Sequence, residues 1–139
     1  MIQRIAILAA CASCALFSTG AIPAQSDGVA RVQKLEDWRR CTEFGRVMRS
    51  KDKEKQRPYY DALLDAAHTF GVVAADYTFI TQKKLRIGMT ACGVLASLGR
   101  PTTKNRTVSA SGHRDQLVYD SPRRLYVYLT DDVVTAWQE

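Results

Sequence analysis

The chain has 139 residues, of which 46% are hydrophobic and 24% are charged, and its formal net charge at pH 7 is +6. This length allows one small folded domain with an appendage, and no internal repeat, Gly/Ser-rich linker or low-complexity tract divides the sequence. The excess of basic residues is moderate, so it favours an acidic protein or an anionic membrane surface as partner and argues against nucleic acid.

The N-terminus has the pattern of a secretory signal. Residues 1–4 carry one positive charge, residues 5–17 are almost wholly apolar, and the small residues around Ala24 form a cleavage pattern. This apolar run is shorter than the stretch of about 18 residues that a membrane-spanning helix needs. We therefore expect export to the periplasm with residues 1–24 removed. Cleavage would take away Arg4 and no acid, which lowers the formal net charge from +6 to +5.

A second interpretation of the N-terminus stays open. Residues 8–11, Leu-Ala-Ala-Cys, match a bacterial lipoprotein cleavage box. In that case Cys11 would become the lipid-bearing N-terminus and would attach the protein to the outer membrane. Simple cleavage near Ala24 would instead release a protein without a lipid anchor.

Two cysteines, Cys41 and Cys92, remain after cleavage at Ala24. An even number in an oxidising compartment predicts a disulfide, which the chain-entropy model credits with about 4 kcal/mol for a loop of this length. Two buried free thiols are the alternative. No Cys-x-x-Cys or histidine spacing accompanies the pair, so we expect no metal site.

Residues 25–71 form a basic helical segment, in which positions 29–57 contain ten basic and five acidic residues. Apolar residues recur there at every third position, which lags the 3.6-residue turn of a helix. A long helix must therefore bend, break near Gly45 or contact different neighbours along its length. A solvated basic helix is one interpretation, and an anionic-surface site is the other. The candidate residues for such a site are Arg39, Arg40, Arg46, Arg49, Lys51 and Lys53.

A second helix is predicted over residues 58–70. Pro58 suits a first helical turn, the apolar residues that follow share one face, and Gly71 provides a stop. His68 lies at the border of that face and is interpreted as a surface histidine. Residues 72–83 fit either a short helix or a strand, and we treat them as a connector to a domain over residues 84–139.

That domain begins with a short capped helix. Leu85, Ile87 and Met89 alternate with Arg86 and Gly88, which predicts an extended lead-in. Thr90 then acts as N-cap for a helix with Ala91, Val94, Leu95 and Leu98 on one face, which Gly99 and Pro101 end. The helix is expected to pack on a core.

The rest of the chain is predicted to form two hairpins. Residues 104–111 and 114–119 flank Gly112-His113, and residues 124–130 and 133–137 flank Asp131-Asp132. Leu125, Val127 and Leu129 would face the short helix, whereas Tyr126 and Tyr128 would face away. The expected fold class is α+β: N-terminal helices, then one short helix packed on a small antiparallel β-meander.

Separated pieces of residues 84–138 resemble the SmpA/OmlA (BamE-like) domain of small envelope lipoproteins. The resemblance rests on Gln116-Leu-Val-Tyr119, Leu125-Tyr-Val-Tyr-Leu129, Val133-Val-Thr-Ala-Trp-Gln138 and the fold motif Gly88, Met89, Thr90, Val94, Gly99 and Pro101. It implies a fold related to β-lactamase inhibitory protein, and envelope proteins as partners, among them the β-barrel assembly complex. Some members also contact anionic phospholipid. Residues 29–57 have no counterpart in that domain.

Little in the sequence points to an enzyme. His68 and His113 are the histidines, and His113 is expected at an exposed hairpin tip without an orienting partner. Asp131 and Asp132 are interpreted as residues that suit the backbone of a tight turn, and not as a catalytic carboxylate pair. Cys92 at a helix start lacks neighbouring positive charge that would make it a reactive thiolate. We expect no catalytic residue and no cofactor.

Two functions from different classes follow. The first is an envelope protein-binding module, accessory to outer-membrane protein assembly or envelope integrity, with Tyr126 and Tyr128 as protein contact and the basic helix near the membrane surface. The second is an inhibitor or binding module for a secreted hydrolase. Tyr126 and Tyr128 also fit ordinary half-exposed strand positions, where aromatic residues are favoured.

Overall fold

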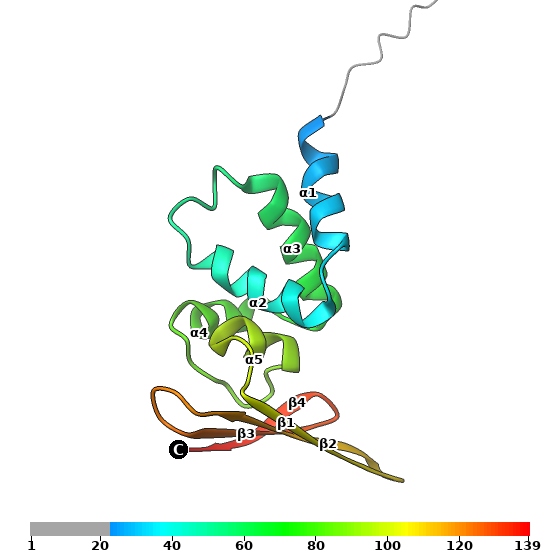
Figure 1. Cartoon of the computed structure of the whole chain (residues 1–139), viewed down its shortest axis with the longest axis vertical. Coiled ribbons are helices and arrows are strands. Elements are labelled where there is room, and N and C mark those ends of the chain that lie inside the picture. The colour runs from blue at the N-terminus through cyan, green and yellow to red at the C-terminus, as the bar shows by residue number, and fades with distance from the viewer. Residues whose placement is uncertain (1–22) are drawn as a thin grey trace, which may run out of the picture.

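The structure is a computed structural model that describes residues 23–139 (Figure 1). Five α-helices precede a four-stranded antiparallel sheet and lie on one side of it, so the predicted α+β arrangement is confirmed. Cys11 and the predicted signal peptide lie outside the described residues, except Pro23 and Ala24, with which the first helix begins. Within the described part, no helix has both the length and the apolarity of a membrane span.

The elements follow one another without long loops. The helices are α1 (Pro23–Gln33), α2 (Asp37–Met48), α3 (Arg57–Thr69), a 3₁₀ turn η1 (Ala74–Asp76), α4 (Tyr77–Thr81) and α5 (Ala91–Leu98). The strands are β1 (Thr103–Ser109), β2 (Gly112–Tyr119), β3 (Leu125–Thr130) and β4 (Val133–Gln138).

Of the three alternatives for the basic segment, the helix breaks, but it does so at residues 34–36 and not near Gly45. α1 ends at Gln33 and α2 begins at Asp37, and the guanidinium of Arg40 donates to backbone carbonyls of residues 32, 33 and 35 at the break. Gly45 instead lies inside α2, where a Cβ would collide with the carbonyl of Ala96. The glycine therefore allows the close approach of α2 to α5. Because the helix is interrupted at residues 34–36, the apolar residues spaced three positions apart need not follow one continuous helical face.

The disulfide between Cys41 and Cys92 is formed and joins α2 to α5 with a Cα–Cα distance of 5.2 Å. Both cysteines are buried. The predicted pairing is confirmed, and it fixes the same pair of helices that Gly45 allows to approach. The core beneath these helices contains Phe44, Val47 and Leu63, which have no exposed surface.

The predicted helix over residues 58–70 is confirmed as α3, but the connector after it is more structured than we expected. Residues 74–81 form η1 and α4, and Ile80 is fully buried. Asp76 is also buried, and its carboxylate accepts from the backbone N–H of Val73 and from the guanidinium of Arg86. These contacts pack the segment against the rest of the fold.

The capped helix α5 is as predicted at both ends. The hydroxyl of Thr90 accepts from the backbone N–H of Gly93 at 3.3 Å, and Gly99 has φ of 85°. The extended lead-in is wrong, because Ile87 and Gly88 form a turn with φ of 83° at Gly88. That turn lets Gly88 and Met89 hydrogen-bond to the backbone of Val134.

The sheet has the order β1-β2-β3-β4, so consecutive strands are neighbours. The first hairpin turns at residues 110–111 rather than at Gly112-His113, because Ser109 pairs with Gly112 and both predicted turn residues belong to β2. The second turn is Asp131-Asp132 as predicted. Both of its residues have positive φ, 49° and 64°, which is the conformation of a two-residue type I′ turn.

The two faces of the sheet differ as the alternation predicts. Val127 and Leu129 are buried on the face toward the helices, and Leu125 is partly buried beside them. Among residues 23–139, no helix covers the opposite face (Figure 1). Tyr126 and Tyr128 are half-buried on that second face.

Candidate functional site

The uncovered face of the sheet, which we call the outer face, is almost uncharged. Arg114 is the one charged residue among the twelve positions of three cross-strand rows. The remaining positions are amide, hydroxyl, aromatic or aliphatic residues. The rows are Thr103, Val118, Tyr126 and Gln138; then Asn105, Gln116, Tyr128 and Ala136; then Thr107, Arg114, Thr130 and Val133.

Hydrogen bonds order the middle row of the outer face. The Asn105 amide donates to Oε1 of Gln116 at 2.9 Å, and the Gln116 amide donates to the Tyr128 hydroxyl at 3.4 Å. These side chains line a shallow depression of about 410 Å³, which Arg114 borders. The outer face thus offers amide and phenol groups that are already oriented and an arginine beside them.

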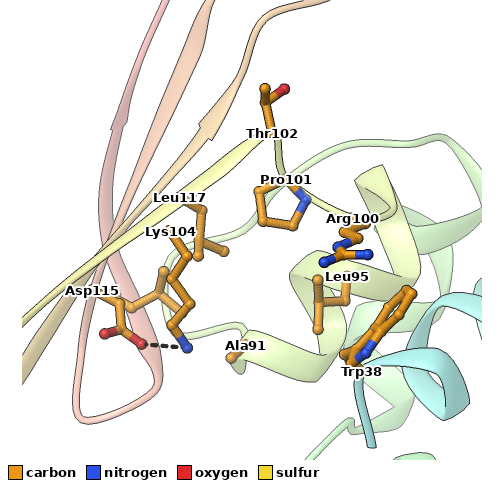
Figure 2. Close-up of a pocket in the computed structure, with 10 residues that line it drawn as sticks. Trp38, Ala91, Leu95, Arg100, Pro101, Thr102, Lys104, Asp115 and Leu117 are labelled. Carbon is orange, nitrogen blue, oxygen red and sulfur yellow. Dashed lines mark ion pairs between the residues drawn. The ribbon is translucent and has the colours of Figure 1, made fainter. Parts of the chain in front are cut away.

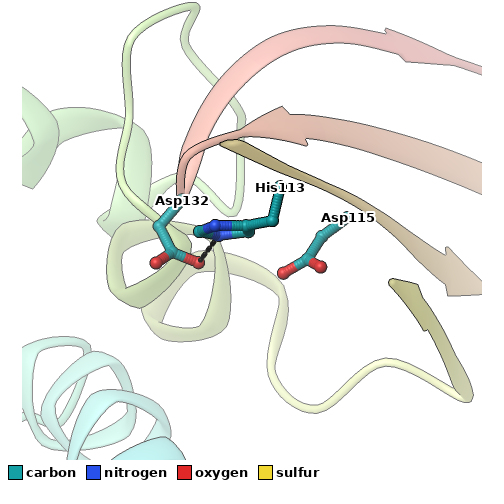
Figure 3. Close-up of side chains that lie close together, drawn as sticks. All are labelled: His113, Asp115 and Asp132. Carbon is teal, nitrogen blue, oxygen red and sulfur yellow. Dashed lines mark ion pairs between the residues drawn. The ribbon is translucent and has the colours of Figure 1, made fainter. Parts of the chain in front are cut away.

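A polar cluster lies on the face of the sheet toward the helices, at the end where the hairpin turns of residues 110–111 and 131–132 are found (Figure 3). His113, Asp115 and Asp132 each place one oxygen or nitrogen within 4.8 Å of the others. The expectation that His113 sits exposed at a hairpin tip is wrong, because His113 is a strand residue with 24% of its side chain exposed. Its Nε2 lies 3.2 Å from Oδ1 of Asp132, and its backbone N–H donates to the carboxylate of Asp131.

Asp115 is the buried centre of this cluster. Arg106 donates to both of its carboxylate oxygens at 2.7 Å, and Nζ of Lys104 lies 3.0 Å from Oδ2. The hydrogen bonds from Arg106, assisted by Lys104, outweigh the cost of burial and lower the pKa of Asp115 to about 2. Asp115 therefore stays ionised and ties β1 to β2.

The chemistry of the polar cluster is that of an ion-pair network. A cation bound between His113, Asp115 and Asp132 would have to displace Arg106 and Lys104 from the Asp115 carboxylate. The side chain of His113 contacts carboxylates, and in residues 27–139 no hydroxyl or thiol hydrogen-bonds to it. Neither a metal centre nor a nucleophile–base pair is assembled by these residues.

The six basic candidates are not gathered on one free surface. Arg49 is partly buried and donates to the carbonyls of Ile80 and Ala96, and burial lowers the pKa of its guanidinium. Arg40 closes the helix break described above, while Arg39 pairs with Glu36 and Arg46 with Glu43. Lys51 and Lys53 lie in the exposed segment between α2 and α3. Of the six candidates, these two lysines are the ones whose side chains form no ion pair or hydrogen bond within residues 27–139.

A groove runs between α5 and the edge of the sheet (Figure 2). It has a volume of about 360 Å³, and Leu95, Pro101 and Leu117 provide much of its apolar lining. Trp38 and Arg100 stand on the helix side and Lys104 and Asp115 on the sheet side. The guanidinium of Arg100 stacks on the Trp38 ring at 4.6 Å, which holds this cation at the groove.

Sequence reasoning identified Tyr126 and Tyr128 but missed their neighbours on the outer face and the whole groove. Gln116 and Arg114 could have been placed on the outer face, because they alternate with the buried Asp115 and Leu117 along β2. The groove draws its residues from α2, α5 and three strands, and no local pattern indicates that they meet.

The fold motif residues occupy structural positions. Met89 and Val94 are fully buried, Thr90 and Gly99 bound α5, Gly88 forms the turn before it, and Pro101 lines the groove.

Comparison with known proteins identifies no relative: no family model, no curated protein and no solved structure matches the chain.

Proposed function

We propose that this protein is a non-enzymatic protein-binding module of the bacterial envelope, accessory to outer-membrane protein assembly or envelope integrity. The proposed contact surface is the outer face of the sheet with Tyr126 and Tyr128 at its centre. The basic residues between α2 and α3, Lys51 and Lys53, would face an anionic membrane surface.

The observation that carries the proposal is the character of the outer face. Charged residues are depleted at the centres of protein interfaces, whereas tyrosine and arginine are enriched there. Within three rows this face has two half-buried tyrosines and a single charge at Arg114, and no helix of residues 23–139 lies above it. A surface kept for solubility alone would be expected to carry interspersed charges of both signs.

The cellular location in this proposal rests on the sequence. The N-terminal pattern of a secretory signal and the resemblance of residues 84–138 to the SmpA/OmlA domain both favour the envelope. The Cys41–Cys92 disulfide is compatible with an oxidising compartment.

The test replaces both tyrosines by serine in an affinity-tagged protein. Truncation of interface tyrosines commonly costs more than about 1 kcal/mol each, so we expect capture of the partner to fall at least about tenfold. The matched control is Tyr126→Phe with Tyr128→Phe, which keeps the aromatic area and should retain most of the capture.

Unchanged capture by the serine variant, with the fold intact by circular dichroism, would refute the outer face as contact surface. Tight inhibition of a secreted hydrolase by the purified protein, with no capture of envelope components, would favour the inhibitor function instead.

A further inference from the structure

The free edge of β1 is a second surface of the molecule that offers unused hydrogen-bonding groups. β1 is an outermost strand of the sheet, it pairs with β2 alone, and all seven of its residues are exposed. In an edge strand, every second residue directs its N–H and C=O away from the sheet. In residues 23–139, no backbone hydrogen bond reaches that side of β1.

The groove between α5 and the sheet lies directly beside this edge. Lys104 of β1 and Leu117 of β2 line its sheet side, and Leu95 of α5 lines its helix side. A second depression of about 360 Å³ shares Trp38, Ala91 and Leu95 with it, so the groove continues along α5. A side chain that projects inward from a strand placed next to β1 would enter this apolar space.

One cation at the groove has no acidic partner in the described part of the chain. Lys104 is held by Asp115 at 3.0 Å, whereas the exposed Arg100 stacks on Trp38 and forms no ion pair there. Arg100 precedes the first residue of β1 by three positions. It therefore stands where the C-terminal end of an added antiparallel strand would lie.

We propose that the groove binds an extended peptide segment of a partner protein, which adds to β1 as an antiparallel fifth strand. An apolar side chain of that segment packs against Leu95, Pro101 and Leu117. An acidic side chain two positions further toward its C-terminus, and so on the same face, pairs with Arg100. This site lies on the helix side of the sheet and is separate from the outer face.

The charges on β1 decide which kind of strand fits. Inward-facing charged residues on an edge strand normally discourage pairing with another sheet. Lys104 and Arg106 face inward here, so a second copy of β1 would bring like charges together. The proposed segment instead sets its apolar residue beside Lys104, whose charge Asp115 already pairs, and its carboxylate beside Arg100. The occupant is therefore a different chain with an acidic residue, and not a second copy of this protein.

The probe is a library of random nonapeptides displayed on phage, selected against the purified protein with its disulfide intact. We expect the selected sequences to share an apolar residue followed two positions later by Asp or Glu. Binding of the corresponding synthetic peptide is then measured by the fluorescence of Trp38, with Trp137→Phe as background so that Trp38 is the tryptophan observed.

Three comparisons test the geometry. Arg100→Glu, a surface change with little effect on folding, should weaken binding about fivefold or more, as expected for reversal of one exposed charge. A peptide of the same composition with its acid moved by one position should bind more weakly, because the acid then faces away from Arg100. The outer-face variant Tyr126→Ser with Tyr128→Ser should bind the peptide as the unchanged protein does.

Three results would overturn the inference: no enriched sequence, equal binding of the two peptides, or full binding by Arg100→Glu. Because the outer-face variant keeps the groove, these results are independent of the capture experiment that tests the proposed function.

Discussion

Replacing Asp115 with Asn tests the ion-pair network that joins the two strands beside the groove. The Asp115 carboxylate has 1% exposed surface and receives two hydrogen bonds of 2.7 Å from Arg106 and an ion pair from Lys104. Asparagine keeps the size of the side chain but loses the charge. The two cations would then face a buried neutral amide.

The size of the effect follows from the pKa of Asp115. A decrease from 3.8 to about 2 corresponds to about 2.4 kcal/mol of stabilisation of the ionised form. The partners Lys104 and Arg106 are 47% and 44% exposed, so water screens part of this interaction. We expect Asp115→Asn to lower the free energy of unfolding by about 1–2 kcal/mol at pH 7.

The pH dependence has a definite sign. The pKa of Asp115 is lower in the folded state than in the unfolded state, so its contribution is fully present above about pH 4 and is lost as the pH falls toward 2. Urea unfolding monitored by circular dichroism at pH 7 and near pH 2 measures the difference. Asp65→Asn, an exposed change on α3, is the control and should alter stability by less than about 0.5 kcal/mol at either pH. Equal destabilisation by Asp115→Asn at both pH values would refute the reasoning.

Further predictions concern the contact of α2 with α5 and the cap of α5. Cys41→Ala with Cys92→Ala opens a link across 51 positions and should cost about 4 kcal/mol in urea unfolding; a loss under 1 kcal/mol would contradict the chain-entropy estimate. Gly45→Ala places a methyl group against the Ala96 carbonyl and should lower stability by about 1–3 kcal/mol in the same urea assay; unchanged stability would contradict the close approach of α2 to α5. Thr90→Ala removes the N-cap of α5 and should lower the free energy of unfolding by about 1 kcal/mol, whereas Thr90→Ser keeps the capping hydroxyl and should retain most of the stability.

Local patterns in the sequence were sufficient for much of the fold. Pro58 and Gly71 bound a helix with a clear apolar face, and Thr90 and Gly99 bound another, because caps act within one helical turn. Strict alternation along β3 correctly separated the buried Val127 from the outer face. These signals depend on neighbours only a few positions apart.

The missed features depend on residues that are distant in sequence. Asp115 is a polar residue at a buried position, and only Arg106 and Lys104 on the neighbouring strand make that burial favourable. The sequence suggested Gly45 as a helix break. Its actual role is to leave room for the backbone of Ala96, fifty-one positions later, which no local pattern indicates. The same holds for Trp38 and Arg100, whose stacking at the groove joins a helix to the start of the sheet.

Chemical crosslinking in intact bacterial cells, followed by capture of the tagged protein and identification of its partners by mass spectrometry, tests the proposed function most directly. We predict that envelope proteins are recovered, with components of the β-barrel assembly complex foremost among them, and that crosslinks map to the outer face around Tyr126 and Tyr128. Recovery of a single soluble hydrolase, or of nothing reproducible, would contradict the assembly role.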